Sequence, residues 1–338
     1  MSSTQTEVMP STADLPSGEP VPTSGAPLPK PKPIHLKGLF QTAPSNIDAF
    51  LAHLHRCLQT PSGIDTLLLF IGYTSRLSAS VLQALTGPAI QRSAKQLLAI
   101  ADALPPSATL VFATTKSFPF SPSVALVLRV AKRLKALSVL LSEIRTFMRL
   151  WGLLNMYFWG RGLVLKWRQS KNPPQSSSDE KEKAAKTAPT DKVETTIAWA
   201  QLTACVVFQS LENATYLSSK GILLDWAPAT QGRAARWSAR FWGAFVGIEL
   251  GRLLYESHKR GQRSARERIG SRTVAEAERD EREWGEAWRK SVVRNLAWAP
   301  LTVHWSLEKG LVGEMAIGAL ASIPGVIQMR DLWRRTAE

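Results

Sequence analysis

The most regular hydrophobic pattern in this 338-residue chain lies between Val124 and Trp151. Apolar residues recur there at alternating spacings of four and three. On a helix with 3.6 residues per turn, that alternation confines them to an arc of about 100°. The segment is therefore predicted to be an amphipathic helix, although Val139 and Leu150 fall on its polar side. The apolar stripe consists of Val130, Leu134, Leu137, Leu141, Ile144, Met148 and Trp151.

The same segment is strongly basic, with Glu143 as its only acidic residue. Arg133 and Arg145 lie at the two borders of the stripe, where an arginine stem can cover acyl chains while its guanidinium reaches a phosphate. The alternative is a helix of a soluble bundle with a solvated basic face. The residues predicted to contact lipid headgroups are Arg129, Lys132, Arg133, Lys135, Arg145 and Arg149.

Changes in composition divide the chain into four parts. Residues 1–33 are rich in Pro, Ser and Thr and lack apolar periodicity, which predicts a disordered tail. Residues 34–170 are predicted to be an N-terminal helical region that contains the amphipathic helix. Residues 171–192 combine Pro, Ser, Lys and Glu and are predicted to be a linker. Residues 193–335 are the predicted C-terminal helical membrane region.

Prolines mark the expected helix boundaries in the N-terminal region. Pro61 and Asp65 lie where the second helix of a helical pair would begin. A further short helix is predicted from Ala89 to Ala103, because two prolines follow it. The next stretch, up to Pro122, is predicted to be a loop.

Two apolar segments of the C-terminal region are candidates for contact with the interior of a membrane. Gly310–Met329 contains one charge, Glu314, in twenty residues, and basic residues follow it, so it is the best candidate for a span. Its small residues Gly318 and Ser322 could pack against another helix. Thr195–Leu211 is a run of 17 uncharged residues, for which a buried or interfacial helix is an equal alternative.

Between these segments, Gly243, Gly247 and Gly251 are spaced four apart, so on a helix they line one groove. Each interior glycine costs a helix about 1 kcal/mol relative to alanine. The three glycines are therefore predicted to serve close helix packing and self-association. Residues 259–294 alternate basic and acidic side chains and are predicted to form an exposed helix with many ion pairs.

Composition favours an anionic partner. The chain has 42 Lys and Arg residues against 27 Asp and Glu, a net charge of +15. Tryptophan supplies 12 residues against four tyrosines, and tryptophan collects at membrane–water boundaries, whereas filling a core is its other common use. An anionic phospholipid membrane is therefore preferred to nucleic acid as the partner. The N-terminal residues lack the pattern of a secretory signal, so a cytosolic start is expected.

The chain shows no recognisable catalytic or cofactor-binding pattern. Its five histidines include no pair four residues apart, and its two cysteines, Cys57 and Cys205, have no zinc-ligand spacing. Glycine-rich phosphate loops, nucleophile elbows and paired carboxylates in apolar surroundings are also missing from the sequence. We therefore expect neither an enzyme nor a protein that holds a cofactor or metal.

Several ordered blocks of the chain resemble the peroxin-11 (peroxisomal biogenesis factor 11) family, especially its longer fungal C-type branch. The resemblance spans roughly residues 45 to 335. The linker at 171–192 and the segment 259–294 are additions relative to the short members. The blocks are Ile47–Asp48, Cys57–Thr60, Gly63–Asp65, Phe70–Leu77, Ser142–Gly152, Phe245–Leu253, Arg294–Leu307 and Leu320–Trp333.

This resemblance implies an all-α, membrane-associated helical bundle in the peroxisomal membrane, with its termini facing the cytosol. Family members elongate and tubulate the membrane before fission, self-associate and cooperate with the fission machinery. Combined with the amphipathic segment, the resemblance predicts a protein that remodels the membrane by inserting a cationic amphipathic helix, aided by one or two hydrophobic membrane segments. The alternative function is a small-metabolite channel, which would need several spans enclosing polar residues.

Overall fold

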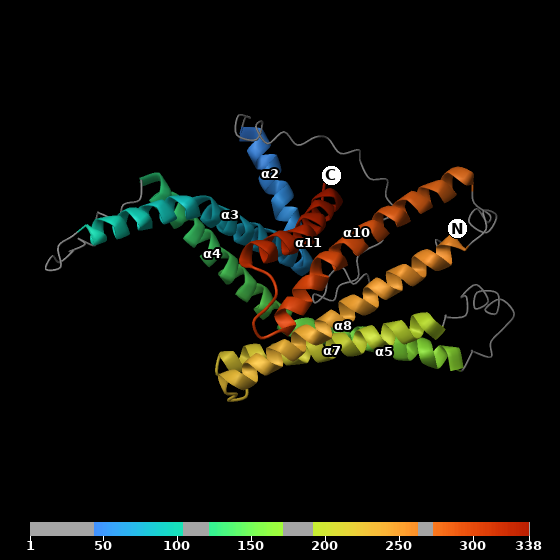
Figure 1. The fold of residues 1–338 in the computed structure, drawn as a ribbon. Coiled ribbons are helices and arrows are strands. Elements are labelled where there is room, and N and C mark those ends of the chain that lie inside the picture. The colour runs from blue at the N-terminus through green and yellow to red at the C-terminus, as the bar shows by residue number, and fades with distance from the viewer. Residues whose placement is uncertain (1–43, 104–121, 172–191, 263–272, 338) are drawn as a thin grey trace.

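The computed structural model describes residues 44–103, 122–171, 192–262 and 273–337, and every regular element among them is a helix (Figure 1). The predicted all-α class is confirmed. The predicted tail at residues 1–33 lies outside the described residues, as does the linker at 171–192 apart from its two end residues. The chain therefore folds through helix packing alone in these four ranges.

The first helices follow the predicted pair. Helix α2 spans Pro44–Cys57 and α3 spans Pro61–Asp102, so Pro61 opens the second helix as expected. The prediction of a separate short helix from Ala89 is wrong, because α3 continues through Pro88. Proline in a helix removes the hydrogen bond to the carbonyl four residues earlier, here that of Ala84. Ala84 and Pro88 are both exposed, so water can serve that carbonyl.

Helix α4 spans Pro122–Met148 and leads through the short 3₁₀ helix η2, Arg149–Trp151, into α5, Gly152–Lys171. The backbone keeps helical dihedral angles at both flanking residues, Met148 and Gly152. The chain thus changes direction at η2 without a loop, and Figure 1 shows α4 and α5 as two arms that meet at this point.

The C-terminal region contains α7 (Lys192–Ser219), α8 (Pro228–Gly261), α10 (Val274–Ser306) and α11 (Glu314–Arg335). Neighbouring helices pack in the order α4, α3, α11, α10, α8, α7, α5, and η2 joins the two ends of this series. The predicted N-terminal and C-terminal regions are therefore packed into each other, since α11 lies on α3 and α7 lies on α5 (Figure 1).

Tryptophan side chains fill much of the space between these helices. Trp298 of α10 contacts both clusters of buried apolar residues, one around Phe245 and Leu202 and the other around Leu301 and Ile317. Further tryptophans pack across helix pairs, such as Trp288 of α10, whose indole donates a hydrogen bond of 2.9 Å to an α8 carbonyl. The composition argument for a membrane boundary therefore applies only to the exposed tryptophans, Trp151, Trp167 and Trp237.

No helix among the described residues is both long enough and apolar enough to cross a membrane. The two predicted membrane segments belong to helices that pack against other helices of the protein. Thr195–Leu211 belongs to α7, which lies between α5 and α8 and buries its apolar side there. Gly310–Met329 coincides largely with α11, which begins at Glu314 and is covered by α3 and α10.

Helix α11 lies close to α3 because its facing residues are small. A Cβ atom added to Gly318 would lie 2.9 Å from the backbone nitrogen of Leu77, and one added to Gly325 would lie 3.3 Å from the Cα atom of Phe70. The prediction that Gly318 packs against another helix is confirmed. At its other end α11 reaches α2, where the rings of Trp333 and His53 lie 3.8 Å apart.

Candidate functional site

The predicted apolar stripe of α4 is divided between the protein interior and the surface. Helix α4 packs on α3 through Ala131, Ser138, Leu141 and Arg145, which are its buried residues. Three members of the stripe lie on the side of this contact: Leu141 is buried, and Leu134 and Met148 are half-buried. The exposed members are Val130, Leu137, Ile144 and Trp151.

A second row of apolar residues lies beside these exposed members. Leu126, Leu140, Phe147 and Leu154 follow one another at spacings of seven or fourteen residues, and Phe158 continues the first row into α5. A spacing of seven keeps residues on one face of a helix, so each row follows one face of α4, and exposed apolar residues at the same spacing continue on α5 beyond the bend at η2. We call the whole surface the α4–α5 apolar face: Leu126, Val130, Leu137, Leu140, Ile144, Phe147, Trp151, Leu154 and Phe158.

Every side chain of the α4–α5 apolar face is at least 37% exposed, and Trp151 reaches 71%. Single exposed apolar residues are ordinary on protein surfaces, whereas large contiguous patches indicate a binding surface. Sequence reasoning missed Leu126, Leu140, Phe147, Leu154 and Phe158, because it stopped at Trp151 and followed only one row. The seven-residue repeat that continues past Trp151 was the available signal.

Exposed basic residues accompany the α4 half of this face, although Lys135 lines the groove between α3 and α4 on another side of the helix. Arg129, Lys132, Arg133 and Lys135 all lie on the surface, and their contact with lipid headgroups stays a prediction. Arg133 falls within the second apolar row, between Leu126 and Leu140. Its long side chain can lie along the face while its guanidinium extends outward. This half of α4 therefore combines apolar and cationic groups at one surface.

Arg145 is used differently from the prediction. Its guanidinium donates two hydrogen bonds, of 2.7 and 3.0 Å, to the carboxylate of Asp65 on α3. Only 9% of Arg145 is exposed, and a bidentate pair of this kind is strong where water is excluded. Arg145 could reach a headgroup only by breaking this pair, so we correct its role to that of a link between α4 and α3.

Arg149 is likewise turned into the protein. Its guanidinium donates hydrogen bonds of 2.9 and 2.7 Å to Glu212 of α7. Burial lowers the pKa of the Arg149 guanidinium, but the charge and hydrogen bonds of Glu212 more than compensate, so the pKa lies above its usual value. Asn213 also donates to the carbonyl of Leu150 at 3.2 Å. These contacts hold η2 on α7 and thereby fix the bend between α4 and α5.

The three glycines of α8 have different surroundings. A Cβ atom added to Gly243 would lie 3.1 Å from the Thr302 hydroxyl, so this glycine permits close packing of α8 on α10. The same construction at Gly247 and Gly251 meets nothing within 4 Å. Gly243 therefore serves packing within the protein, while Gly247 and Gly251 lie on the surface, where the predicted self-association stays a prediction.

One groove of about 390 Å³ lies between α3 and α4. Several of its charged lining residues form ion pairs, including Arg76 with Glu314 at 2.8 Å. Among the residues that the structure describes, no group of three or more His, Cys, Asp and Glu side chains could hold a metal ion. The groove gives no catalytic arrangement that competes with the apolar face.

The site is thus a surface on two consecutive helices, and its binding residues come from one stretch of the sequence. Two arginine–carboxylate pairs to α3 and α7 hold that stretch in place. Comparison of the chain with known proteins returns no matching family model, no matching curated protein and no matching solved structure.

Proposed function

We propose that this protein binds the cytosolic leaflet of the peroxisomal membrane through the α4–α5 apolar face and thereby elongates and tubulates the membrane during peroxisome proliferation and fission. The observation that carries the proposal is the set of nine exposed apolar side chains together with exposed basic residues of the same helix, such as Arg133. The organelle, self-association and cooperation with the fission machinery rest on the resemblance to peroxin-11 proteins.

Both parts of the face contribute to binding an anionic leaflet. A large apolar side chain that is half exposed loses about 1 kcal/mol of unfavourable hydration when it enters the acyl boundary. Each basic residue near anionic lipid adds about 1 kcal/mol, an attraction that salt weakens. Apolar side chains at the acyl boundary and basic residues at the headgroups both act without deep insertion. We therefore expect reversible binding at the membrane surface.

Insertion on one side of the bilayer gives a route to curvature. Side chains such as Phe147 and Trp151 would occupy area among the headgroups of one leaflet only, which favours bending toward that side. The bend at η2 places the two parts of the face on helices of different direction. The inserted side chains would therefore occupy leaflet area along two directions. Because Arg149 is paired with Glu212, the bend is present before the membrane is met.

The decisive experiment uses the purified full-length chain and vesicles of defined composition. Vesicles with anionic phospholipid should bind the protein and become tubular in negative-stain electron microscopy, whereas vesicles of phosphatidylcholine alone should bind it weakly. The double variant Lys132→Gln with Arg133→Gln should bind anionic vesicles roughly 30-fold more weakly at low salt, because two contributions of about 1 kcal/mol are lost.

The matched control is the double variant Arg282→Gln with Arg289→Gln, which removes the same charge from exposed positions of α10. It should retain most of the binding. Equal loss in both variants, or equal binding to neutral and anionic vesicles, would show that the face is not the membrane-binding surface. For the organelle, a fluorescent fusion should colocalise with a peroxisomal membrane marker, and its overexpression should elongate the peroxisomes. A fusion that labels another compartment contradicts this assignment.

A further inference from the structure

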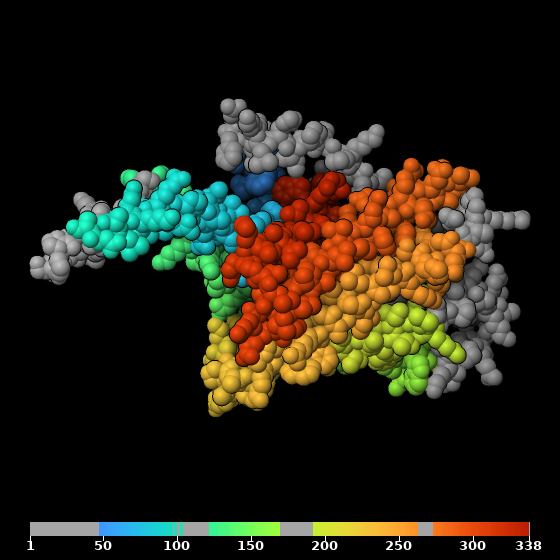
Figure 2. Space-filling model, in the orientation of Figure 1, coloured from blue at the N-terminus to red at the C-terminus, as the bar shows by residue number. Residues whose placement is uncertain are grey.

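The connection between α7 and α8 presents a second exposed apolar group. Ile222, Leu223 and Leu224 are consecutive, and their exposed fractions are 72%, 50% and 46%. We call residues 221–226 the α7–α8 tip. Three consecutive exposed aliphatic residues oppose folding and solubility unless they serve a binding function. In Figure 2 the tip forms a protruding corner of the molecule, next to α4.

The tip is an ordered turn. Leu224 has a φ of 61°, a left-handed conformation that disfavours leucine and that glycine or asparagine adopts more readily. The amide of Ile222 donates to the carbonyl of Leu217 at 3.0 Å, and the amide of Trp226 donates to that of Leu224 at 2.8 Å. Backbone strain that persists in a native fold is concentrated at functional positions. The aliphatic side chains are therefore held outward before any partner is met.

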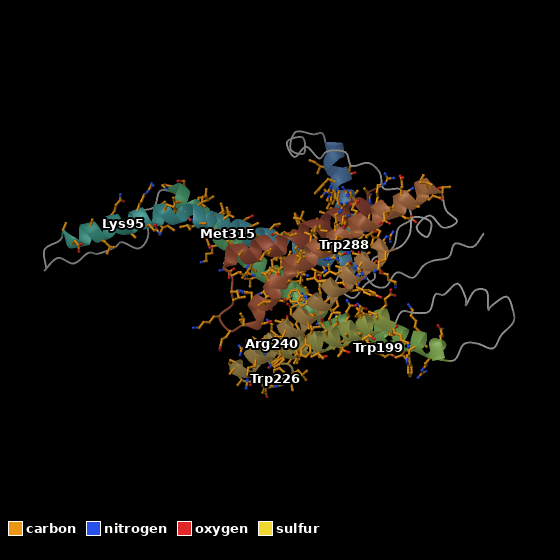
Figure 3. All side chains as sticks on the ribbon, turned by 45° about the vertical axis from the view of Figure 1, so that its right-hand side comes forward. Lys95, Trp199, Trp226, Arg240, Trp288 and Met315 are labelled. Atoms are coloured by element: carbon orange, nitrogen blue, oxygen red, sulfur yellow. The ribbon has the colours of Figure 1, made fainter. Side chains whose placement is uncertain are left out.

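Basic and aromatic side chains surround the base of the tip. The first turns of α8 carry Arg233, Arg236 and Arg240, and none of these arginines forms an ion pair with a carboxylate among the described residues. The guanidinium of Arg240 lies 4.7 Å from the centre of the Trp237 ring, which is 51% exposed. Figure 3 shows Trp226 and Arg240 at the same end of the molecule.

The tip also stands beside the α4–α5 apolar face. Lys220, at the start of the connection, forms an ion pair with Glu143 of α4. Tyr216 of α7 lines the groove between α3 and α4 together with Val139. Glu143 lies one helical turn before Phe147, so the ion pair brings the start of the connection next to an edge of the α4–α5 apolar face, whereas Val139 belongs to the other side of α4.

We infer that the α7–α8 tip is a second membrane-inserting element, which places Ile222, Leu223 and Leu224 in the same anionic leaflet as the α4–α5 apolar face. The layering of the tip matches that of a leaflet: aliphatic groups come outermost, followed by Trp237 and the arginines at headgroup depth. This inference rests on the proposed function, because it assigns a further contact with the same membrane. A protein partner or a second copy is the competing occupant that the test must separate.

Fluorescent labelling tests the inference on the full-length chain. An environment-sensitive dye is attached to Leu223→Cys at the tip, to Phe147→Cys on the apolar face, or to Glu308→Cys in the α10–α11 turn as a control. The native thiols Cys57 and Cys205 are 0% and 1% exposed, and burial raises the pKa of the Cys205 thiol, so both stay unlabelled in the folded protein. The probe is a vesicle of phosphatidylcholine with phosphatidylserine.

The expected result is a blue shift and increased emission at positions 223 and 147, quenching of both by a lipid-attached quencher, and no change at 308. A change in emission at position 147 without one at 223 overturns the inference and leaves the proposed function intact. No change at either position overturns both the inference and the proposed function. A change at 223 alone supports membrane insertion of the tip and refutes insertion of the α4–α5 apolar face. If the emission at 223 depends on protein concentration without lipid, the tip is an interface between copies and the inference fails.

A substitution at Leu224 separates membrane binding from folding. Leu224→Asn removes an apolar group and suits the left-handed backbone, so the melting temperature should stay equal or rise. Binding to anionic vesicles should nevertheless fall about tenfold, as expected for the loss of roughly one exposed leucine from the inserted group. Unchanged binding in this stably folded variant would contradict membrane insertion of the tip.

Discussion

Replacing Leu140 and Leu154 by glutamate tests whether the α4–α5 apolar face enters the membrane. Both leucines point outward, with 54% and 56% exposure, so the fold should tolerate the change. Each substitution removes about 1 kcal/mol of apolar transfer energy and adds the cost of bringing a carboxylate to the acyl boundary. We expect a total loss of about 3 kcal/mol, which corresponds to roughly 100-fold weaker vesicle binding.

The control variant places the same two glutamates on α3. Leu85 and Leu98 are 72% and 66% exposed and lie outside the apolar face, so Leu85→Glu with Leu98→Glu repeats the charge change at comparable exposure. The general weakening of attraction to anionic lipid is then equal in both double variants. Only the contribution of the inserted positions differs between them, and the α3 variant should bind within about threefold of the unmodified protein.

Binding is measured by sedimentation with anionic vesicles at several lipid concentrations, and tubulation is scored on the same samples by electron microscopy. Circular dichroism and thermal melting establish that both variants are folded. Equal binding of the two double variants would refute insertion of the face, whatever their common difference from the unmodified chain. Normal binding of the Leu140 and Leu154 variant with loss of tubulation would separate membrane attachment from curvature.

The remaining predictions concern stability and thiol reactivity. Gly318→Ala should destabilise the fold by about 2 kcal/mol, because its Cβ would meet the α3 backbone at 2.9 Å. Gly247→Ala should instead stabilise the fold by up to about 1 kcal/mol, because nothing lies within 4 Å of its added Cβ. Equal melting temperatures of these two variants would contradict the packing of α11 on α3. Arg149→Met should cost about 3 kcal/mol by leaving Glu212 without its cation and should speed amide exchange around η2, while unchanged exchange would show that this pair does not hold the bend. Burial raises the pKa of the Cys205 thiol, so it stays protonated and unreactive toward a thiol reagent at pH 8 until the protein unfolds; rapid labelling of the native protein at Cys205 would contradict its burial.

Local sequence signals predicted the helical fold and several helix boundaries. Pro61 begins α3 as expected. The uncharged run Thr195–Leu211 was expected to be either a membrane span or a buried or interfacial helix, and in α7 it packs within the protein. These predictions succeeded because proline geometry and apolar content act on the chain near each residue. Pro88 misled the prediction, since one missing hydrogen bond on an exposed turn does not end a helix.

The candidate site depended more on distant parts of the chain. Periodicity predicted a single apolar stripe on α4, but it could not show that α3 would cover one edge of that stripe and leave the other exposed. Arg145 and Arg149 carry the same local signal as Arg133, and only the positions of Asp65 and Glu212 in the fold distinguish them. The charge pattern along one helix therefore shows how many basic side chains it carries. It does not show which of them pair with a carboxylate, because Asp65 and Glu212 lie 80 and 63 residues away in the chain.

The packing of α11 on α3 also has a consequence for how the protein is made. Arg76 and Glu314, which pair across these two helices, are separated by 238 residues. At synthesis rates of about 5–20 residues per second, the apolar side of α3 waits roughly 12–50 s before the helix that covers it has been translated. During that interval the side of α3 that α11 will cover stays exposed to solvent, and exposed apolar surface of this kind is what chaperones protect. The same close, glycine-lined contact that completes the folded protein thus makes its nascent chain dependent on early protection.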